Sequence, residues 1–221
     1  MPVTIVTITG AAYFQPILDL TERLLQRERR KVTAARIGHR ENGYALSVVL
    51  LLVVALESYV GRVSYLQSNL PKGGTAKPPR TTVPDYLAKL RKSFRLQKSL
   101  TEAFVLRDAI AHGHVWELQV SDHSVHGQVL RGAKLLPGYG DYKYQVALNP
   151  RTRRSSIGGL NLVPSAVGTN EVYKVLTLVW RTLSFLARSG LLEKAAFSYH
   201  GRFQGKPFEF WELRNVLKGA L

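Results

Sequence analysis

The apolar segment Tyr44–Leu56 constrains the fold of this chain most strongly. It runs for 13 residues with almost no polar side chain and ends directly before Glu57. A membrane span needs about 20 such residues, so this run is too short to cross a bilayer alone. A helix that is apolar on every side is instead covered by other helices. We therefore predict a buried helix from about Glu41 to Leu66, at the centre of a helical bundle.

Helical periodicity and capping residues predict the surrounding elements. A capping box at Ser99-Leu100-Thr101-Glu102 starts one helix, which Gly113 ends, and Thr169 or Asn170 caps another that stops at Gly190. Residues from Asn69 to Pro84 form a proline- and glycine-rich loop. The expected further helices are about Tyr13–Ala35, Pro84–Leu96, Ser99–His112, Thr169–Arg188 and a short terminal helix at Phe208–Leu213.

The periodicity changes to two after the helix that ends near His112. Trp116, Leu118 and Val120 alternate with polar residues, and a second alternating run covers Tyr142–Leu148. We expect a small antiparallel β insertion at about 115–149, whose tyrosines either stack nucleic-acid bases or cover the bundle. The predicted fold class is mainly α, an antiparallel helical bundle with this insertion. With 221 residues and no internal repeat, the chain is expected to form one domain over 1–221, with its bundle at about 13–114 and 169–221.

The net charge of +16, from 31 Lys and Arg against 15 Asp and Glu, favours a polyanionic partner, and nucleic acid is the commonest. Such charge runs also occur as plain solvated faces. The sequence has no cysteine, which excludes disulfides, thiolate metal sites and cysteine catalysis. Met1–Gly10 lacks the basic region of a secretory signal, and we expect a cytoplasmic protein without membrane contact. The candidate RNA-contacting residues are Arg27, Arg30, Lys31, Lys92, Arg95, Arg153 and Arg154.

Arg107, Asp108 and His112 form the candidate catalytic set. They lie at the end of a predicted helix, with the spacing Arg107-Asp108-x3-His112. An imidazole exchanges protons near neutral pH, a carboxylate four residues earlier can orient it, and a guanidinium can stabilise a charged phosphate. An ordinary exposed carboxylate–imidazole pair beside a solvated arginine gives the same pattern.

Helical geometry separates Arg107 from His112 by about 140° around the axis, with Phe104 and Ala111 between them. One helix therefore cannot easily direct both side chains at one atom. Two copies related by a two-fold axis would bring one chain's arginine near the other's histidine. We predict a homodimer in which this contact buries Phe104.

The run Arg107-Asp108-x3-His112 resembles the signature of the HEPN-domain ribonucleases, an arginine followed by a polar residue and, after three more residues, a histidine near a helix end. The resemblance implies a HEPN-like bundle that cleaves RNA without a metal or other cofactor by attack of the 2′-OH. It also implies a composite site in a homodimer, a role as a toxin or defence nuclease, and a neutralising antitoxin or regulatory partner. One toxin branch carries a tyrosine two residues after the histidine, where this chain has His114.

Several alternatives stay open at this stage. A non-catalytic RNA- or nucleotide-binding HEPN module fits the charge equally well. Auxiliary roles are assigned to His114 and Glu57, and for Glu57 a contact with Arg62 or solvent is favoured over one with Arg107. A metal site at His112-x-His114 lacks a third ligand at fixed spacing, so no metal site is expected. Pro71–Thr75 lacks the spacing of a phosphate-binding loop, which argues against nucleotide hydrolysis.

Overall fold

The computed structural model describes residues 9–29, 42–68, 81–112, 116–121, 129–135, 147, 149 and 154–221. Most of these residues are helical, which confirms the mainly α fold class. The described α-helices are α1 (Phe14–Arg29), α2 (Gly43–Ser68), α3 (Val83–Leu90), α4 (Gln97–Ala111), α6 (Thr169–Arg188) and α7 (Leu213–Gly219). Short 3-10 helices are η1 (Gly10–Tyr13), η2 (Pro164–Ala166), η3 (Lys194–Phe197) and η4 (Phe210–Glu212).

Helix α2 forms the centre of the bundle, as its apolar segment predicts. It packs against α1, α4, α6 and η1, and its side chains are buried on several sides. By length and composition alone, α2 could also cross a membrane, but 56% of its most apolar window is buried inside the structure. Burial of Leu52, Val53, Leu56 and Tyr59 gives the bundle the apolar interior that offsets the entropy of folding.

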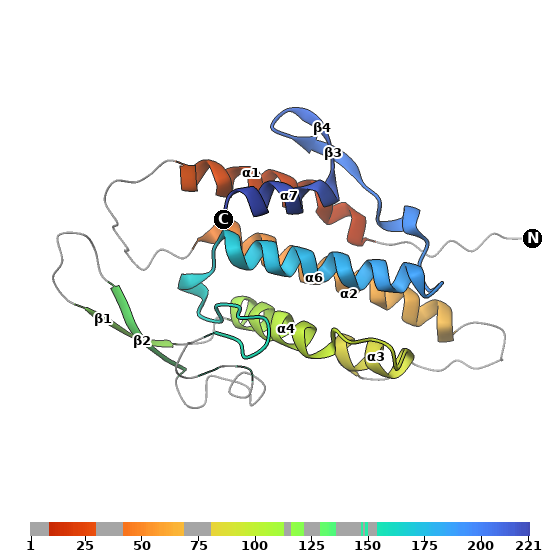
Figure 1. Ribbon diagram of the computed structural model, residues 1–221, viewed down its shortest axis with the longest axis horizontal. Coiled ribbons are helices and arrows are strands. Elements are labelled where there is room, and N and C mark those ends of the chain that lie inside the picture. The colour runs from red at the N-terminus through yellow and green to blue at the C-terminus, as the bar shows by residue number, and fades with distance from the viewer. Residues whose placement is uncertain are drawn as a thin grey trace, which may run out of the picture.

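The other helices surround α2 on two sides. Figure 1 shows α1 and α7 on one side of the α2–α6 layer and α3 and α4 on the other. Helix α6 runs beside α2 and buries Val172, Val175, Val179 and Leu183 against the core, at the spacing expected of an amphipathic helix. Gly190, with φ +67°, ends α6 in the left-handed conformation that glycine tolerates, as predicted.

The predicted start of α4 is wrong by two residues. Helix α3 ends at Leu90 instead of near Leu96, a turn follows, and α4 begins at Gln97 with Leu96 as its N-cap. Ser99 is therefore inside the first turn. The capping box does not form because the Glu102 carboxylate makes tertiary hydrogen bonds instead.

Glu102 anchors α4 to the turn at 155–158. Its carboxylate is 4% exposed and accepts hydrogen bonds from Ser155 Oγ at 2.7 Å, Ile157 N at 2.6 Å and Gly158 N. Three donors offset the cost of burying a charge. The anchor fixes how α4 lies against the chain that leads into α6.

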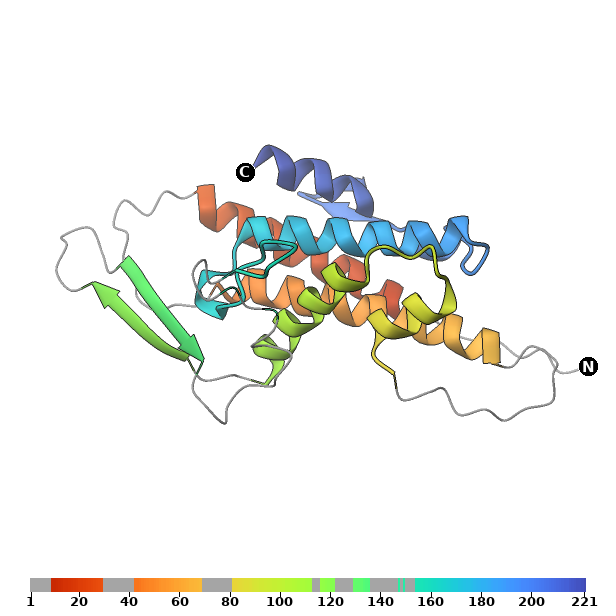
Figure 2. The same ribbon diagram turned by 60° about the horizontal axis from the view of Figure 1, so that its bottom comes forward.

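The expected small antiparallel β insertion is confirmed in part: its first strand covers the alternating run at Trp116–Val120, but the strand that pairs with it is not the run at Tyr142–Leu148. Strands β1 (Trp116–Ser121) and β2 (Val129–Leu135) pair antiparallel, with Trp116 opposite Leu135 and an irregularity between Gln119 and Val120. Figures 1 and 2 show this hairpin at one end of the bundle, projecting away from the helices. Of the expected strand at 142–148, only Ala147 is among the described residues, and it is buried and helical, not extended.

A second hairpin was not predicted. Strands β3 (His200–Phe203) and β4 (Lys206–Glu209) pair antiparallel through a two-residue turn at Gln204 and Gly205, which have φ of 53° and 75°. Positive φ at both central residues is the geometry that matches strand twist in a tight hairpin. The terminal helix predicted at Phe208–Leu213 lies later in the chain: Phe208 and Glu209 belong to β4, η4 follows, and α7 begins only at Leu213.

Candidate functional site

The C-terminal half of α4 carries the predicted catalytic residues. Leu100, Ala103, Leu106 and Ala109 are buried, which fixes the rotation of the helix about its axis. The helix ends after Ala111, and the His112 N–H donates to Asp108 O at 2.9 Å. Arg107 and Asp108 are half-buried, whereas His112 is exposed. Arg107 and Asp108 thus lie together near the end of the helix, and His112 is its C-cap residue.

Arg107 is held between two carboxylates. Its Nη2 lies 2.6 Å from Glu57 Oε1 on α2, and its Nη1 lies 3.2 Å from Asp108 Oδ1. The expectation that Glu57 would contact Arg62 or solvent is therefore wrong. Packing of α4 on α2 brings Arg107 next to Glu57, a tertiary approach that spacing along α2 cannot reveal. Arg107, Glu57 and Asp108 thus form one polar cluster, in which Glu57 takes the partner that the sequence favoured less.

Burial raises the pKa of Glu57, and this is the largest effect on that carboxyl. The nearby Arg107 guanidinium lowers the pKa of Glu57, and the Asp108 carboxylate raises it again. The net shift is upward, so the attraction of Arg107 only partly offsets the loss of hydration. Without Arg107, the pKa of Glu57 would therefore be higher still.

Phe104 does not have the predicted role. Its side chain is only 9% exposed within a single chain, and Cζ of Arg107 lies 5.3 Å from the centroid of its ring. Contacts inside the bundle already cover the ring, so no second copy is needed to bury it. A helical projection places Phe104 on the side of α4 opposite its apolar stripe, but other parts of the chain cover that side as well.

The guanidinium of Arg107 is incompletely satisfied. Its Nη atoms face Glu57 and Asp108, but its Nε is buried and has no hydrogen-bond partner among the described residues. Unsatisfied buried donors are uncommon in folded proteins. The arrangement orients Arg107 firmly while leaving its side chain 22% exposed.

The predicted RNA-contacting residues do not form one track in the described part of the chain. Arg27 is exposed near the end of α1, Lys92 and Arg95 are exposed in the turn before α4, and Arg154 is exposed in a bridge with Asn161. Figure 1 shows α1 and the α3–α4 turn on opposite sides of the α2–α6 layer. Arg30, Lys31, Arg153 and His114 lie outside the described residues, as do the tyrosines proposed for stacking.

Within the described ranges, no group of three or more His, Cys, Asp or Glu side chains is arranged to hold a metal ion. Sequence reasoning missed the contact between Glu102 and the turn at 155–158, although this contact fixes the helix that carries the site. The paired serines and glycines at Ser155-Ser156 and Gly158-Gly159 are typical of a turn with free backbone donors, and they are the one hint that an acid could bind there.

Comparison with known proteins assigns no family. No family model, no curated protein and no solved structure matches this chain.

Proposed function

We propose that this chain is a metal-independent endoribonuclease of the HEPN type. The observation that carries the proposal is the position of Arg107, which Glu57 and Asp108 hold near the end of α4, five residues before the exposed His112. The net charge of +16 supports RNA as the substrate. The resemblance of Arg107-Asp108-x3-His112 to the HEPN signature supports the choice of reaction.

The proposed chemistry is a transesterification within the RNA. The 2′-OH attacks the adjacent phosphorus, the P–O5′ bond breaks, and the products are a 2′,3′-cyclic phosphate and a 5′-OH. His112 takes the proton from the 2′-OH, and an imidazole that carries a proton returns one to the leaving 5′-oxygen. Arg107 stabilises the additional negative charge on the phosphate oxygens.

The proposed working unit is a homodimer with a composite site. Arg107 turns toward Glu57 on α2, whereas His112 lies about 140° around the α4 axis, so one helix separates the two groups. A two-fold contact through the exposed Ala111 and His112 would bring the histidines together near both arginines. Phe104 no longer supports this contact, since the single chain buries it.

Mixing two inactive variants tests the composite site. Arg107→Lys keeps the charge of the arginine but loses its planar donors, and His112→Ala removes the imidazole. Neither variant alone should cleave RNA, and a mixture should regain part of the activity if the residues act across an interface. The introduction of charge at the proposed contact, as Ala111→Glu, should separate the chains and stop cleavage together. A chain that sediments as a monomer at micromolar concentration and still cleaves RNA would exclude the composite site.

A non-catalytic RNA- or nucleotide-binding module is the second candidate. The observation in its favour is the pairing of Arg107 with two carboxylates, which cancels much of the charge that a catalytic arginine offers to a phosphate. A cleavage assay in EDTA separates the candidates: the enzyme cuts RNA, whereas the binding module retains it intact. A role as a toxin or defence nuclease, a neutralising antitoxin and a cytoplasmic location remain parts of the proposal that follow from the resemblance.

A further inference from the structure

A pocket of about 510 Å³ lies between the C-terminal half of α6, η3 and the start of α7. It is on the side of α6 that faces α7, whereas α4 lies on the other side of the α2–α6 layer (Figure 1). Volumes of 300–1,000 Å³ are typical of small-molecule sites in proteins. The pocket is therefore large enough for one ligand and is separate from the cluster around Arg107.

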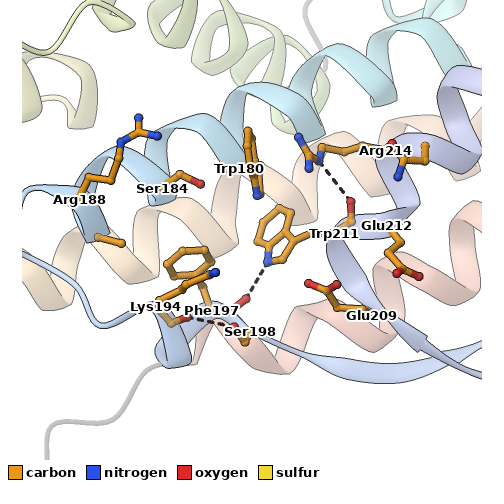
Figure 3. Close-up of a pocket in the computed structure, with 12 residues that line it drawn as sticks. Trp180, Ser184, Arg188, Lys194, Phe197, Ser198, Glu209, Trp211, Glu212 and Arg214 are labelled. Carbon is orange, nitrogen blue, oxygen red and sulfur yellow. Dashed lines mark hydrogen bonds between the residues drawn. The ribbon is translucent and has the colours of Figure 1, made fainter.

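Aromatic side chains form the floor of this pocket (Figure 3). Trp211 and Phe197 are 5% and 4% exposed, and Trp211 Nε1 donates to Phe197 O at 2.8 Å. Trp211 also packs edge-on against Phe14 and Phe210 in the core. The floor is thus fixed by the fold itself and needs no ligand to form it.

Trp180 and Arg214 form one wall. The Arg214 guanidinium lies over the Trp180 ring at 3.6 Å from its centroid, and Arg214 Nε donates to Trp211 O at 3.2 Å. Burial lowers the pKa of Arg214 from its usual range, although Tyr173 and Glu209 counteract this. A guanidinium remains charged at neutral pH even so, and stacking leaves its edge available for hydrogen bonds.

Three cationic side chains line the pocket, and they lie at its two ends. Arg188 and Lys194 are exposed at the end opposite to Arg214 (Figure 3). In the described ranges, none of these three forms an ion pair with a carboxylate within 4.0 Å, although Glu209 and Glu212 also line the pocket. An aromatic floor with cationic side chains at both ends favours a ligand that combines a planar ring with an anionic group.

We propose that this pocket binds a nucleotide, free or as one unit of an RNA strand. The planar base lies among Trp180, Trp211 and Phe197, and its phosphate contacts Arg188 and Lys194. Glu209 and Glu212 accept hydrogen bonds from amino groups of the base, as carboxylates do from cytosine and adenine amines. This assignment does not depend on whether the chain cleaves RNA, because none of its residues belongs to α4.

The test titrates nucleotides into the full chain carrying His112→Ala, which leaves RNA uncut during the measurement. Two of the three tryptophans, Trp180 and Trp211, line the pocket, so their fluorescence reports binding there, and calorimetry gives the dissociation constant. Adenosine 5′-monophosphate should bind saturably. Adenosine lacks the phosphate and ribose 5-phosphate lacks the base, and each should bind at least tenfold more weakly.

Charge reversal supplies a matched pair of variants. Arg188→Glu with Lys194→Glu should weaken binding at least tenfold, whereas Arg202→Glu with Lys206→Glu, the same charge change at exposed positions of the β3–β4 hairpin, should leave it unchanged. Trp180→Ala should weaken binding independently of charge.

A short single-stranded oligoribonucleotide in the same assay identifies the source of the nucleotide. Pocket-dependent binding of the oligonucleotide but not of the mononucleotide assigns the site to an RNA strand, and binding of both assigns it to a free nucleotide as well. Equal effects of the two charge-reversed pairs, or no binding of either probe at millimolar concentration, would overturn the proposal.

Discussion

Glu57 and Arg107, 50 residues apart in sequence, form an ion pair in which Oε1 and Nη2 are 2.6 Å apart. The pair joins the apolar central helix α2 to α4. It explains why a carboxylate follows directly after the most apolar segment of the chain. Arg107 therefore contributes to the fold as well as to the proposed chemistry.

Arg107→Ala should destabilise the chain, and His112→Ala should not. Loss of Arg107 leaves the half-buried Glu57 without its cation and uncovers Phe104, at a cost of about 1–3 kcal/mol. His112 is exposed, so its removal should change the free energy of unfolding by less than about 0.5 kcal/mol. Urea unfolding at pH 7 measures both. Equal losses for the two variants would show that the ion pair is not formed in solution.

Glu57→Gln should alter how stability depends on pH. Because burial raises the pKa of Glu57, the folded chain binds a proton that the unfolded chain releases between the ordinary glutamate pKa, about 4.3, and the higher folded value. This contribution to stability is complete below that window and is lost as pH rises through it. The free energy of unfolding of the wild type, minus that of Glu57→Gln, should therefore fall as pH rises from 4 to 7.

Urea midpoints at several pH values give this difference. Any pH dependence that arises elsewhere in the chain cancels between the two proteins. A difference that grows with pH would mean that the attraction of Arg107, and not burial, controls the charge of Glu57.

The central helix, and the buried side of the neighbouring helix α6, could be predicted because both depend on the local pattern of apolar residues. The Tyr44–Leu56 segment has no amphipathic alternative, and the α6 core residues recur at helical spacing. Trp180 directly follows one of these core residues, Val179, yet it is only half-buried and stacks with Arg214. That contact joins residues 34 positions apart, and local pattern does not encode it.

The errors at the candidate site have the same origin. Glu102 follows the capping-box pattern, yet its carboxylate binds a turn more than 50 residues later. Phe104 lies on the polar side of a helical projection, yet neighbouring elements cover it. In both cases, a tertiary contact outweighed a signal of about 1 kcal/mol or less.

Glu102→Ala should therefore be much more destabilising than removal of a surface acid. The change leaves the Ser155 hydroxyl and two backbone N–H groups without their acceptor, at a cost of about 2–4 kcal/mol. Glu193→Ala, at an exposed position, is the matched control and should be close to neutral. Chemical denaturation compares them, and a neutral Glu102→Ala would show that the 155–158 turn does not depend on this carboxylate.

RNA binding should weaken steeply with salt. A net charge of +16 favours several phosphate contacts, each of which releases counterions on binding. With about four such contacts, affinity should fall by roughly two orders of magnitude between 50 and 200 mM salt. Fluorescence anisotropy with a labelled single-stranded RNA gives the slope. An affinity that is flat across this range would remove the argument from charge.

Cleavage of RNA in the presence of EDTA tests the central proposal most directly. The wild type should cut single-stranded RNA and leave 2′,3′-cyclic phosphate ends. His112→Ala should lose at least about 100-fold in rate because a general acid–base group typically contributes that much. His200→Ala, which removes an exposed histidine on β3, should cut at the wild-type rate. Cleavage by His112→Ala at the wild-type rate, or no cleavage by the wild type under any of these conditions, would contradict the assignment.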